Sequence, residues 1–362
     1  MNIEKLIETV KELVEINSVT GKEIDIVKYL RDKIEGLGYS PIVQRIRGTQ
    51  ANLICVGDED ALMLCGHLDT VDVVEGWERN PFEFRIEGGK AYGLGVADMK
   101  SGVAILIHLF HDLYSRLKRK PWLVLTCDEE GCSLGMYNFL EEFNDVKFAG
   151  AIFTEPIPGD RIALVDKCFG RYAVDVSVFC GGGHAALKHE EDKMPEIFSG
   201  VGRALKELKA FKRGSSIGEC DYTVSYIHGG GVFLSIPEKI TLRINHICVF
   251  GEDLETTLEE VRSAFSSVGL SVEVKPMDRP TPFLEPFDCS STELSNVFSR
   301  FLDRAVSRSV FDGNLTAMRG IPTVNVGPVG GNIHKANEYI EVWSLREVYN
   351  VVKRCILAFY HM

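Results

Sequence analysis

The stretch that decides the fold is Ala61-Leu62-Met63-Leu64-Cys65-Gly66-His67-Leu68-Asp69. Its first five residues are apolar, which is typical of a strand buried on both faces, and polar side chains follow directly. Other short apolar runs have the same strand character, and a long helical pattern over residues 100–117 lies among them; these runs are 52–56, 122–127 and 149–154. Strands that alternate with helices predict an α/β layer structure around a mainly parallel mixed sheet.

The pattern changes after about residue 166. Strand and helix patterns then follow in the order β-α-β-β-α-β, which is typical of a ferredoxin-like α+β unit; they cover residues 172–179, 194–211, 222–227, 239–249, 252–268 and 270–275. A Pro-rich stretch closes this unit, and α/β patterns resume over 291–305, 323–326 and 344–359. We therefore expect one domain formed by residues 1–166 and 280–362, interrupted by an inserted domain over residues 167–279.

The composition is typical of a folded globular protein with room for two domains, because 45% of the 362 residues are apolar and 25% are charged. The 40 basic and 52 acidic residues give a net charge of −12, which offers no positive surface to a phosphate backbone or an anionic membrane. The apolar run 103–107 is too short to span a bilayer, and residues 1–5 lack the pattern of a secretory signal. We expect a cytoplasmic protein without nucleic-acid or membrane partners.

The ten cysteines contain no Cys-x-x-Cys pair. Half of them sit inside apolar runs, namely Cys55, Cys65, Cys127, Cys180 and Cys248. We therefore expect buried thiols in a reducing compartment rather than disulfides or a thiolate metal site.

Side chains that can bind metals follow three of the predicted strands. His67 and Asp69 follow the first, Asp128-Glu129-Glu130 the second and Glu155 the third. Ligands of open α/β sheets bind in the crevice outside the carboxyl ends of the strands, so these groups are expected to converge. Asp69 could hold the second nitrogen of a metal-bound His67, or simply cap a strand end. The two adjacent glutamates could divide the tasks of metal ligand and proton acceptor, or belong to a solvated acidic loop.

Two glycine-rich stretches add further candidates. Gly93–Lys100 opens the long helix and could be mistaken for a dinucleotide fingerprint, but Asp98 at its sixth position would repel a pyrophosphate. The Asp98 carboxylate could instead bridge two metal ions. His334 lies in the loop 330–334, just after a predicted strand, where it is either a further ligand or a surface histidine.

A serine-hydrolase interpretation fails on its context. Gly214-Ser215-Ser216-Ile217-Gly218 matches the G-x-S-x-G pattern, and His228-Gly229-Gly230-Gly231 resembles an oxyanion loop. However, the serine follows a charged helix end instead of a buried strand, and the glycine loop comes after the serine instead of before it.

Taken together, five motifs resemble the ordered signature of the M20 metallopeptidase family, which includes succinyl-diaminopimelate desuccinylases, acetylornithine deacetylases, carboxypeptidases and dipeptidases. The motifs are His67-x-Asp69, Gly93-x-Gly95-x-x-Asp98-Met99-Lys100, Asp128-Glu129-Glu130, Glu155-Pro156 and His334. The resemblance spans essentially the whole chain. It implies a zinc-exopeptidase-like α/β catalytic domain, in which the inserted unit is a lid and dimerisation domain.

The resemblance implies two divalent metal ions. His67, Asp98 and Glu155 would bind one ion, and Asp98, Glu130 and His334 would bind the other, with Asp98 as the bridge. Zinc suits these nitrogen and oxygen ligands best, and cobalt or manganese would also fit.

The resemblance also implies catalytic roles. Asp69 would orient His67, Glu129 would be the general base, and His184 of the lid would reach the substrate carbonyl oxygen across a homodimer. The Asp98-Met99 peptide is expected in the cis form. These roles imply hydrolysis of the amide bond of a small N-acyl amino acid. The alternatives are a dipeptidase or carboxypeptidase acting on a short peptide, and a non-catalytic binding protein with the same fold.

Three stretches depart from the family pattern. Family lids commonly carry an Asn before Ile-Pro, and an Asp-x-Arg whose Arg pairs with the substrate carboxylate. The corresponding stretches here, Phe233–Pro237 and Asn245–Ile247, lack both residues. Arg243 lies on the same strand face as Asn245 and is the candidate substitute. Desuccinylases have a Gly-Thr-Ser-Asp loop that binds carboxylates, and the corresponding residues here, Ser309–Gly313, have a different sequence. The identity of the acyl group on the substrate is therefore not predicted.

Overall fold

The computed structural model describes residues 2–186, 193–230 and 233–361. The chain divides into two compact units, one of residues 1–167, 288–307 and 311–362, and one of residues 168–287 and 308–310. The chain re-enters the first unit at Asp288, eight residues after the boundary expected at residue 280. The reason is that residues just before Asp288 still pair with the inserted unit, since Leu284 forms a β-bridge with Arg171.

The first unit is built on a nine-stranded sheet with the order β1-β2-β6-β3-β7-β20-β9-β18, in which β19 pairs with β9. The four central strands, β6, β3, β7 and β20, run parallel to one another, which confirms the predicted α/β fold class. The strands are β1 (Ile42–Arg47), β2 (Gln50–Cys55), β3 (Ala61–His67), β6 (Trp122–Thr126), β7 (Phe148–Phe153), β9 (Leu164–Cys168), β18 (Phe287–Asp288), β19 (Arg304–Ser307) and β20 (Thr323–Asn325).

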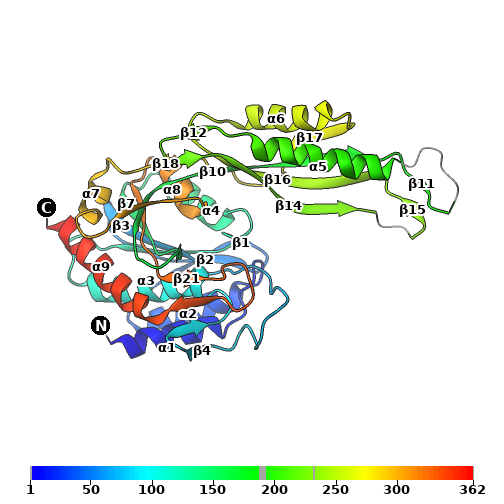
Figure 1. Ribbon diagram of the computed structural model, residues 1–362. Coiled ribbons are helices and arrows are strands. Elements are labelled where there is room, and N and C mark those ends of the chain that lie inside the picture. Colours follow the sequence, from blue (N-terminus) through cyan, green and yellow to red (C-terminus); the bar gives the residue numbers. More distant parts are fainter. Residues whose placement is uncertain (1, 187–192, 231–232, 362) are drawn as a thin grey trace. The chain divides into compact units, whose positions relative to one another are not determined.

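A smaller five-stranded sheet completes the strands of this unit, with β4 (Arg85–Glu87), β5 (Lys90–Tyr92), β22 (Tyr339–Glu341), β21 (Val329–Gly331) and β8 (Ile157–Pro158) in that order. The helices are α1 (Ile3–Val14), α2 (Ile24–Gly36), α3 (Ser101–Tyr114), α4 (Leu134–Glu142), α7 (Glu293–Phe298), α8 (Asp312–Met318) and α9 (Val342–Tyr360), and a tight turn η1 (Val96–Lys100) precedes α3. Helix α3 packs against both α1 and α9 (Figure 1). Its apolar face joins those of α1, α2 and α9 in one core cluster with the central strands.

The helix expected over residues 291–305 is wrong in its second half. Helix α7 ends at Phe298, and Arg304–Ser307 forms β19 instead. Strand pairing with β9 decides this, and the neighbouring Leu164 N–H donates to the Asp303 carbonyl oxygen at 2.9 Å. Non-local pairing therefore overrides the local helical spacing.

The second unit has the predicted order β-α-β-β-α-β. A four-stranded antiparallel sheet has the order β14-β16-β10-β17, and α5 and α6 pack together over one face of it (Figure 1). A short antiparallel pair of β11 with β15 and a short hairpin of β12 with β13 are added. The elements are β10 (Gly170–Phe179), β11 (Gly183–His184), α5 (Met194–Ala210), β12 (Gly214–Ser215), β13 (Gly218–Glu219), β14 (Asp221–Gly229), β15 (Ser235–Ile236), β16 (Lys239–Cys248), α6 (Leu254–Ser267) and β17 (Val272–Pro276). No helix in the described part of the chain is long and apolar enough to cross a membrane.

Candidate metal centre

Three neighbouring strands bring polar side chains to one edge of the large sheet. β3 pairs in parallel with both β6 and β7, so the carboxyl ends of the three strands meet at the same edge. His67 is the last residue of β3, Glu130 lies in the loop after β6, and Glu155 comes two residues after the end of β7. The side chains that follow the three strands are thus gathered at one place.

Asp98 and His334 complete two groups of potential metal ligands. In the first group, His67 Nε2 lies 3.1 Å from Asp98 Oδ1 and 3.6 Å from Glu155 Oε2. In the second, His334 Nε2 lies 3.1 Å from Asp98 Oδ2 and 3.0 Å from Glu130 Oε1. Within each group all the ligand atoms lie within 4.8 Å of one another. The two oxygens of Asp98 therefore face two different imidazoles, as those of a bridging carboxylate would.

A hydrogen bond at the other ring nitrogen fixes the tautomer of His67. Its Nδ1 lies 2.9 Å from the carbonyl oxygen of Asp69, and because a carbonyl only accepts, Nδ1 carries the proton. Nε2 therefore faces the carboxylates of Asp98 and Glu155, and it can offer them a proton or offer its lone pair to a metal ion. Glu155 Oε1 is buried and has no hydrogen-bond partner among the described residues. A buried imidazole nitrogen surrounded by carboxylate oxygens needs a positive charge at this point, so these residues fit a metal ion.

The pKa values of the site reflect an excess of buried carboxyl groups. Burial raises the pKa of Glu129 well above its ordinary value, and burial raises that of Glu155 to about 7. Hydrogen bonds to Asp98 and Glu130 raise the pKa of His334 to about 10. For His67, burial acts to lower the pKa, but the carboxylates around the ring outweigh it and hold the pKa well above the ordinary value. The site therefore attracts positive charge strongly.

Asp69 holds the loop that carries the two glutamates. Its carboxylate accepts the backbone N–H groups of Glu129 and Glu130, each at 3.1 Å, and the Thr20 hydroxyl at 2.8 Å. The Asp69 carboxylate lies 3.6 Å from His67 Nδ1, so the close contact with the imidazole comes from the Asp69 main-chain carbonyl. Asp69 thus fixes the positions of both the imidazole and the glutamate loop.

Asp98 is positioned by a turn that sequence analysis only partly predicts. Gly95 has φ +74°, and a Cβ there would lie 2.4 Å from Thr70 Cγ2, so this turn requires glycine. The Asp98-Met99 peptide bond is cis, as the resemblance implies. The carboxylate of Glu338, which is 1% exposed, accepts the N–H groups of Gly95, Ala97 and Asp98 at 2.9, 2.7 and 3.0 Å.

Glu338 is not predictable from the local sequence, because its partners lie some 240 positions earlier in the chain. The same holds for Asp312, which is 1% exposed and accepts a hydrogen bond from the Thr126 hydroxyl at 2.7 Å. Burial raises the pKa of Asp312 to about 6. Neither residue follows a strand in the pattern that revealed the other carboxylates.

Glu338→Gln is expected to weaken metal binding and activity by roughly 10- to 100-fold, as for other residues that orient metal ligands. An amide keeps one acceptor oxygen and brings an N–H₂ group toward backbone N–H donors, so the turn that carries Asp98 loosens. The control is Glu341→Gln, since Glu341 pairs with Lys90 at 3.6 Å and is 27% exposed. Titration of the metal-free chains with Zn²⁺ measures the effect, and equal affinity in both variants would contradict it.

The dinucleotide and serine-hydrolase interpretations are excluded by local structure. The N–H groups at Gly95 and Ala97, which a phosphate would need, are already bound by the Glu338 carboxylate. The Gly214–Gly218 segment forms a short hairpin of β12 and β13, not a strand-to-helix turn.

Two predicted substrate-binding residues lie in the second unit. His184 is exposed on β11, and its Nδ1 accepts the Ala186 N–H at 3.2 Å. Arg243 on β16 forms a bidentate ion pair with Asp175, at 2.8 and 2.9 Å. Asp175 already binds the Arg243 guanidinium. Arg243 therefore does not simply replace the lid arginine of the family pattern, which pairs with the substrate carboxylate.

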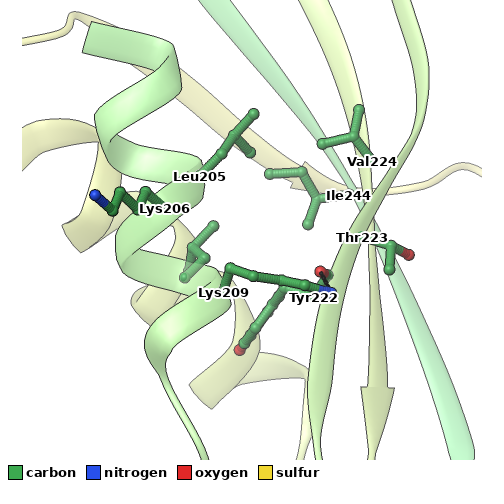
Figure 2. Close-up of a pocket in the computed structure, with 8 residues that line it drawn as sticks. Leu205, Lys206, Lys209, Tyr222, Thr223, Val224 and Ile244 are labelled. Atoms are coloured by element: carbon green, nitrogen blue, oxygen red, sulfur yellow. Dashed lines mark hydrogen bonds between the residues drawn. The ribbon is translucent and has the colours of Figure 1, made fainter.

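A groove in the second unit lacks the chemistry of an active site. It has a volume of about 460 Å³ and lies between α5 and the strands β14 and β16 (Figure 2). Its lining is largely apolar and contains neither a carboxylate nor an imidazole; it consists of Leu205, Lys206, Leu208, Lys209, Tyr222, Thr223, Val224 and Ile244. Lys209 is bound by Asp221 at 2.8 Å.

Comparison with known proteins identifies the family. Residues 63–358 match the model of peptidase family M20/M25/M40. The chain belongs to this family. It is 26% identical to a succinyl-diaminopimelate desuccinylase of Thioalkalivibrio sulfidiphilus, over 92% of this chain and 93% of the relative. It is 27% identical to the enzyme of the same name from Wolinella succinogenes, over 95% of this chain and 97% of the relative.

Solved structures of M20 peptidases share the fold. An M20 family metallo-carboxypeptidase from Sulfolobus solfataricus superposes with a TM-score of 0.77 at 16% identity, covering 99% of this chain and 100% of that one. Human carnosine dipeptidase 1 superposes with a TM-score of 0.76 at 15% identity, covering 99% and 97%. As a member of this family, the chain is a hydrolase of amide or peptide bonds, which confirms the predicted enzyme class.

Proposed function

We propose that this M20 hydrolase uses two divalent metal ions to cleave the amide bond of a small N-acyl amino acid. His67, Asp98 and Glu155 would hold one ion, and Asp98, Glu130 and His334 the other. The observation that carries this proposal is the Asp98 carboxylate, which lies 3.1 Å from an imidazole nitrogen on each side. When bound, such a pair of ions lowers the pKa of a water molecule toward ~7 and polarises a carbonyl oxygen. Zinc suits the ligand set best, and cobalt or manganese would also serve.

Glu129 is proposed as the general base. It lies beside the metal ligands, in a group with His67 and Glu130 whose ligand atoms are within 4.8 Å of one another. Its backbone N–H is fixed by Asp69, so the side chain starts from a defined position. In this role the Glu129 carboxylate takes a proton from the attacking water and passes it to the leaving nitrogen. Its raised pKa suits a group that must both accept and release a proton.

The acyl class of substrate is supported by the curated relatives, which are desuccinylases. The test is amine release by mass spectrometry from zinc-loaded enzyme and a mixed panel of N-acetyl amino acids, N-succinyl amino acids and dipeptides. Hydrolysis of the acyl substrates supports the proposal and identifies the acyl group. Cleavage of the peptides alone would replace it with the dipeptidase or carboxypeptidase assignment.

We also propose a homodimer formed through the second unit, in which His184 reaches the substrate of the partner subunit. β14 is an edge strand of the four-stranded sheet, and Ile227 on it is 64% exposed. Phe198 on α5, which packs against β14, is 59% exposed. An unpaired strand edge with exposed apolar side chains suits pairing with a second copy.

Ile227→Asp is expected to convert the dimer into a monomer and to lower activity, because a charge on the strand edge opposes its pairing. Light scattering after size-exclusion chromatography measures the mass. Ile86→Asp is the matched control, because Ile86 is 48% exposed in the first unit. A wild-type monomer, or an unchanged mass in the Ile227 variant, would contradict the proposed interface.

The cysteines support the proposed location in the cytoplasm. The structure forms no disulfide among the ten cysteines, and nine of them are buried. Burial raises the pKa of Cys55 and of Cys355 to about 12. Buried thiols that stay protonated suit a reducing compartment.

A further inference from the structure

A second cluster of potential metal ligands lies inside the second unit, and the proposed catalysis does not use it. Cys220 directly precedes β14, His246 lies on β16, and Glu252 lies just before α6. All three side chains are buried, and Cys220, His246 and Glu252 are 0%, 1% and 7% exposed. Their sulfur, nitrogen and oxygen atoms lie within 4.8 Å of one another, and His246 Nε2 is 3.4 Å from Glu252 Oε2.

The hydrogen bonds of Thr257 fix the tautomer of His246. The Thr257 hydroxyl donates its one hydrogen to the Asp253 carbonyl oxygen at 2.8 Å. It must therefore accept at His246 Nδ1, which lies 2.9 Å away and so carries the ring proton. Metal-bound histidines donate their other ring N–H to an oxygen in this way.

His246 Nε2 is left without a hydrogen-bond partner among the described residues. In the neutral ring this atom directs a lone pair toward the Glu252 carboxylate, which is itself an acceptor. Tyr222 stacks on the imidazole, with ring centroids 4.2 Å apart and planes inclined by 11°, which holds this orientation. Two acceptors that face each other in a buried space need a positive charge between them, which either a proton on Nε2 or a bound metal ion supplies.

The charges around the cluster are balanced when a divalent cation is bound. The Arg213 guanidinium lies 3.0 Å from Glu252 Oε1 and 2.6 Å from Glu260 Oε1. With the thiol ionised, Cys220, Glu252 and Glu260 carry three negative charges against the one positive charge of Arg213, so a dication brings the group to neutrality. Burial raises the pKa of the Cys220 thiol, and the Arg213 backbone N–H, which donates to Cys220 Sγ at 3.1 Å, opposes this effect. A bound dication would ionise the thiol.

We propose that Cys220, His246 and Glu252 bind a Zn²⁺ ion in the second unit, separate from the catalytic centre. Thiolate, imidazole and carboxylate are the ligands that zinc takes in proteins, and a water would complete a tetrahedral site. The ion would join the start of β14, the end of β16 and the start of α6. The absence of a Cys-x-x-Cys pair hides this site in the sequence, because strand pairing and not local spacing brings the ligands together. The proposal does not depend on the catalytic function.

Cobalt spectroscopy separates this site from the catalytic centre. Metal-free full-length chain is loaded with Co²⁺, and absorbance in the near ultraviolet is recorded. A thiolate ligand gives a sulfur-to-cobalt charge-transfer band, whereas a centre with only nitrogen and oxygen ligands gives none. We expect the band in the wild-type chain, and one zinc ion per chain more than the two of the catalytic centre by elemental analysis.

Cys220→Ser is expected to abolish the band and to lower the zinc content by one ion per chain. Cys132→Ser is the control. Cys132 lies two positions after Glu130, so this variant removes the thiol that follows a proposed catalytic ligand in the sequence. We expect this variant to keep both the band and the zinc content. His246→Gln serves as a second variant, expected to weaken cobalt binding at the thiolate. The wild-type measurement is decisive even if the variants do not fold, because a cobalt-loaded wild-type chain without the band overturns the proposal. A band that persists in Cys220→Ser overturns it as well. An inactive enzyme that shows the band would contradict the catalytic proposal and leave this one standing.

Discussion

Glu129→Gln is expected to lower kcat by roughly 10²- to 10⁴-fold, the usual contribution of a positioned acid–base group, without changing metal content. Gln has the shape of Glu but cannot take a proton from water. Glu129 is absent from the two ligand groups that contain Asp98, so its replacement leaves both groups intact. Single-turnover kinetics and elemental analysis of the same preparation measure the two quantities.

The matched control is Glu83→Gln, because Glu83 is an exposed glutamate in the same unit. It should retain wild-type kcat. The pH profile gives a second readout, because burial raises the pKa of Glu129, and the carboxylate needed as a base is lost as the pH falls through this raised value. The acid limb of the kcat profile should therefore vanish in Glu129→Gln. Substantial turnover in this variant would refute the assignment of the base.

Much of the site could be predicted because it follows from sheet geometry. His67, Glu130 and Glu155 each come after a buried parallel strand, and the carboxyl ends of such strands necessarily meet. The period and length of the apolar runs were sufficient to find those strands. The regular elements of the second unit follow in the same way from alternating patterns, such as that of β10.

The remaining features depend on contacts between distant parts of the chain. Glu338 can be recognised only when its carboxylate is seen to accept the N–H groups around Asp98. The engagement of Arg243 by Asp175 depends on the register in which β16 pairs with β10. Residues 304–307 form a strand because they pair with β9. None of these interactions leaves a periodic trace in the local sequence.

Asp98→Asn is expected to remove metal from both catalytic positions and to lower kcat/KM by at least ~10²-fold. The carboxylate faces His67 with one oxygen and His334 with the other, so one substitution affects both groups. Contacts with these imidazoles outweigh the effect of burial and hold the pKa of Asp98 below its ordinary value, which means that the site favours its negative charge. Asn keeps the shape but loses that charge, and its amide offers only one acceptor oxygen.

The measurement is metal affinity by titration of the metal-free chain, together with kcat/KM at saturating Zn²⁺. Asp303→Asn is the control, because Asp303 is 82% exposed and 3.6 Å from Arg161. The two variants should unfold at similar temperatures when both are metal-free, which separates loss of metal from loss of fold. If Asp98→Asn binds both ions as tightly as the wild type, the carboxylate is not the bridge. The two imidazoles would then belong to independent sites, and a mechanism that depends on a shared pair of ions would be wrong.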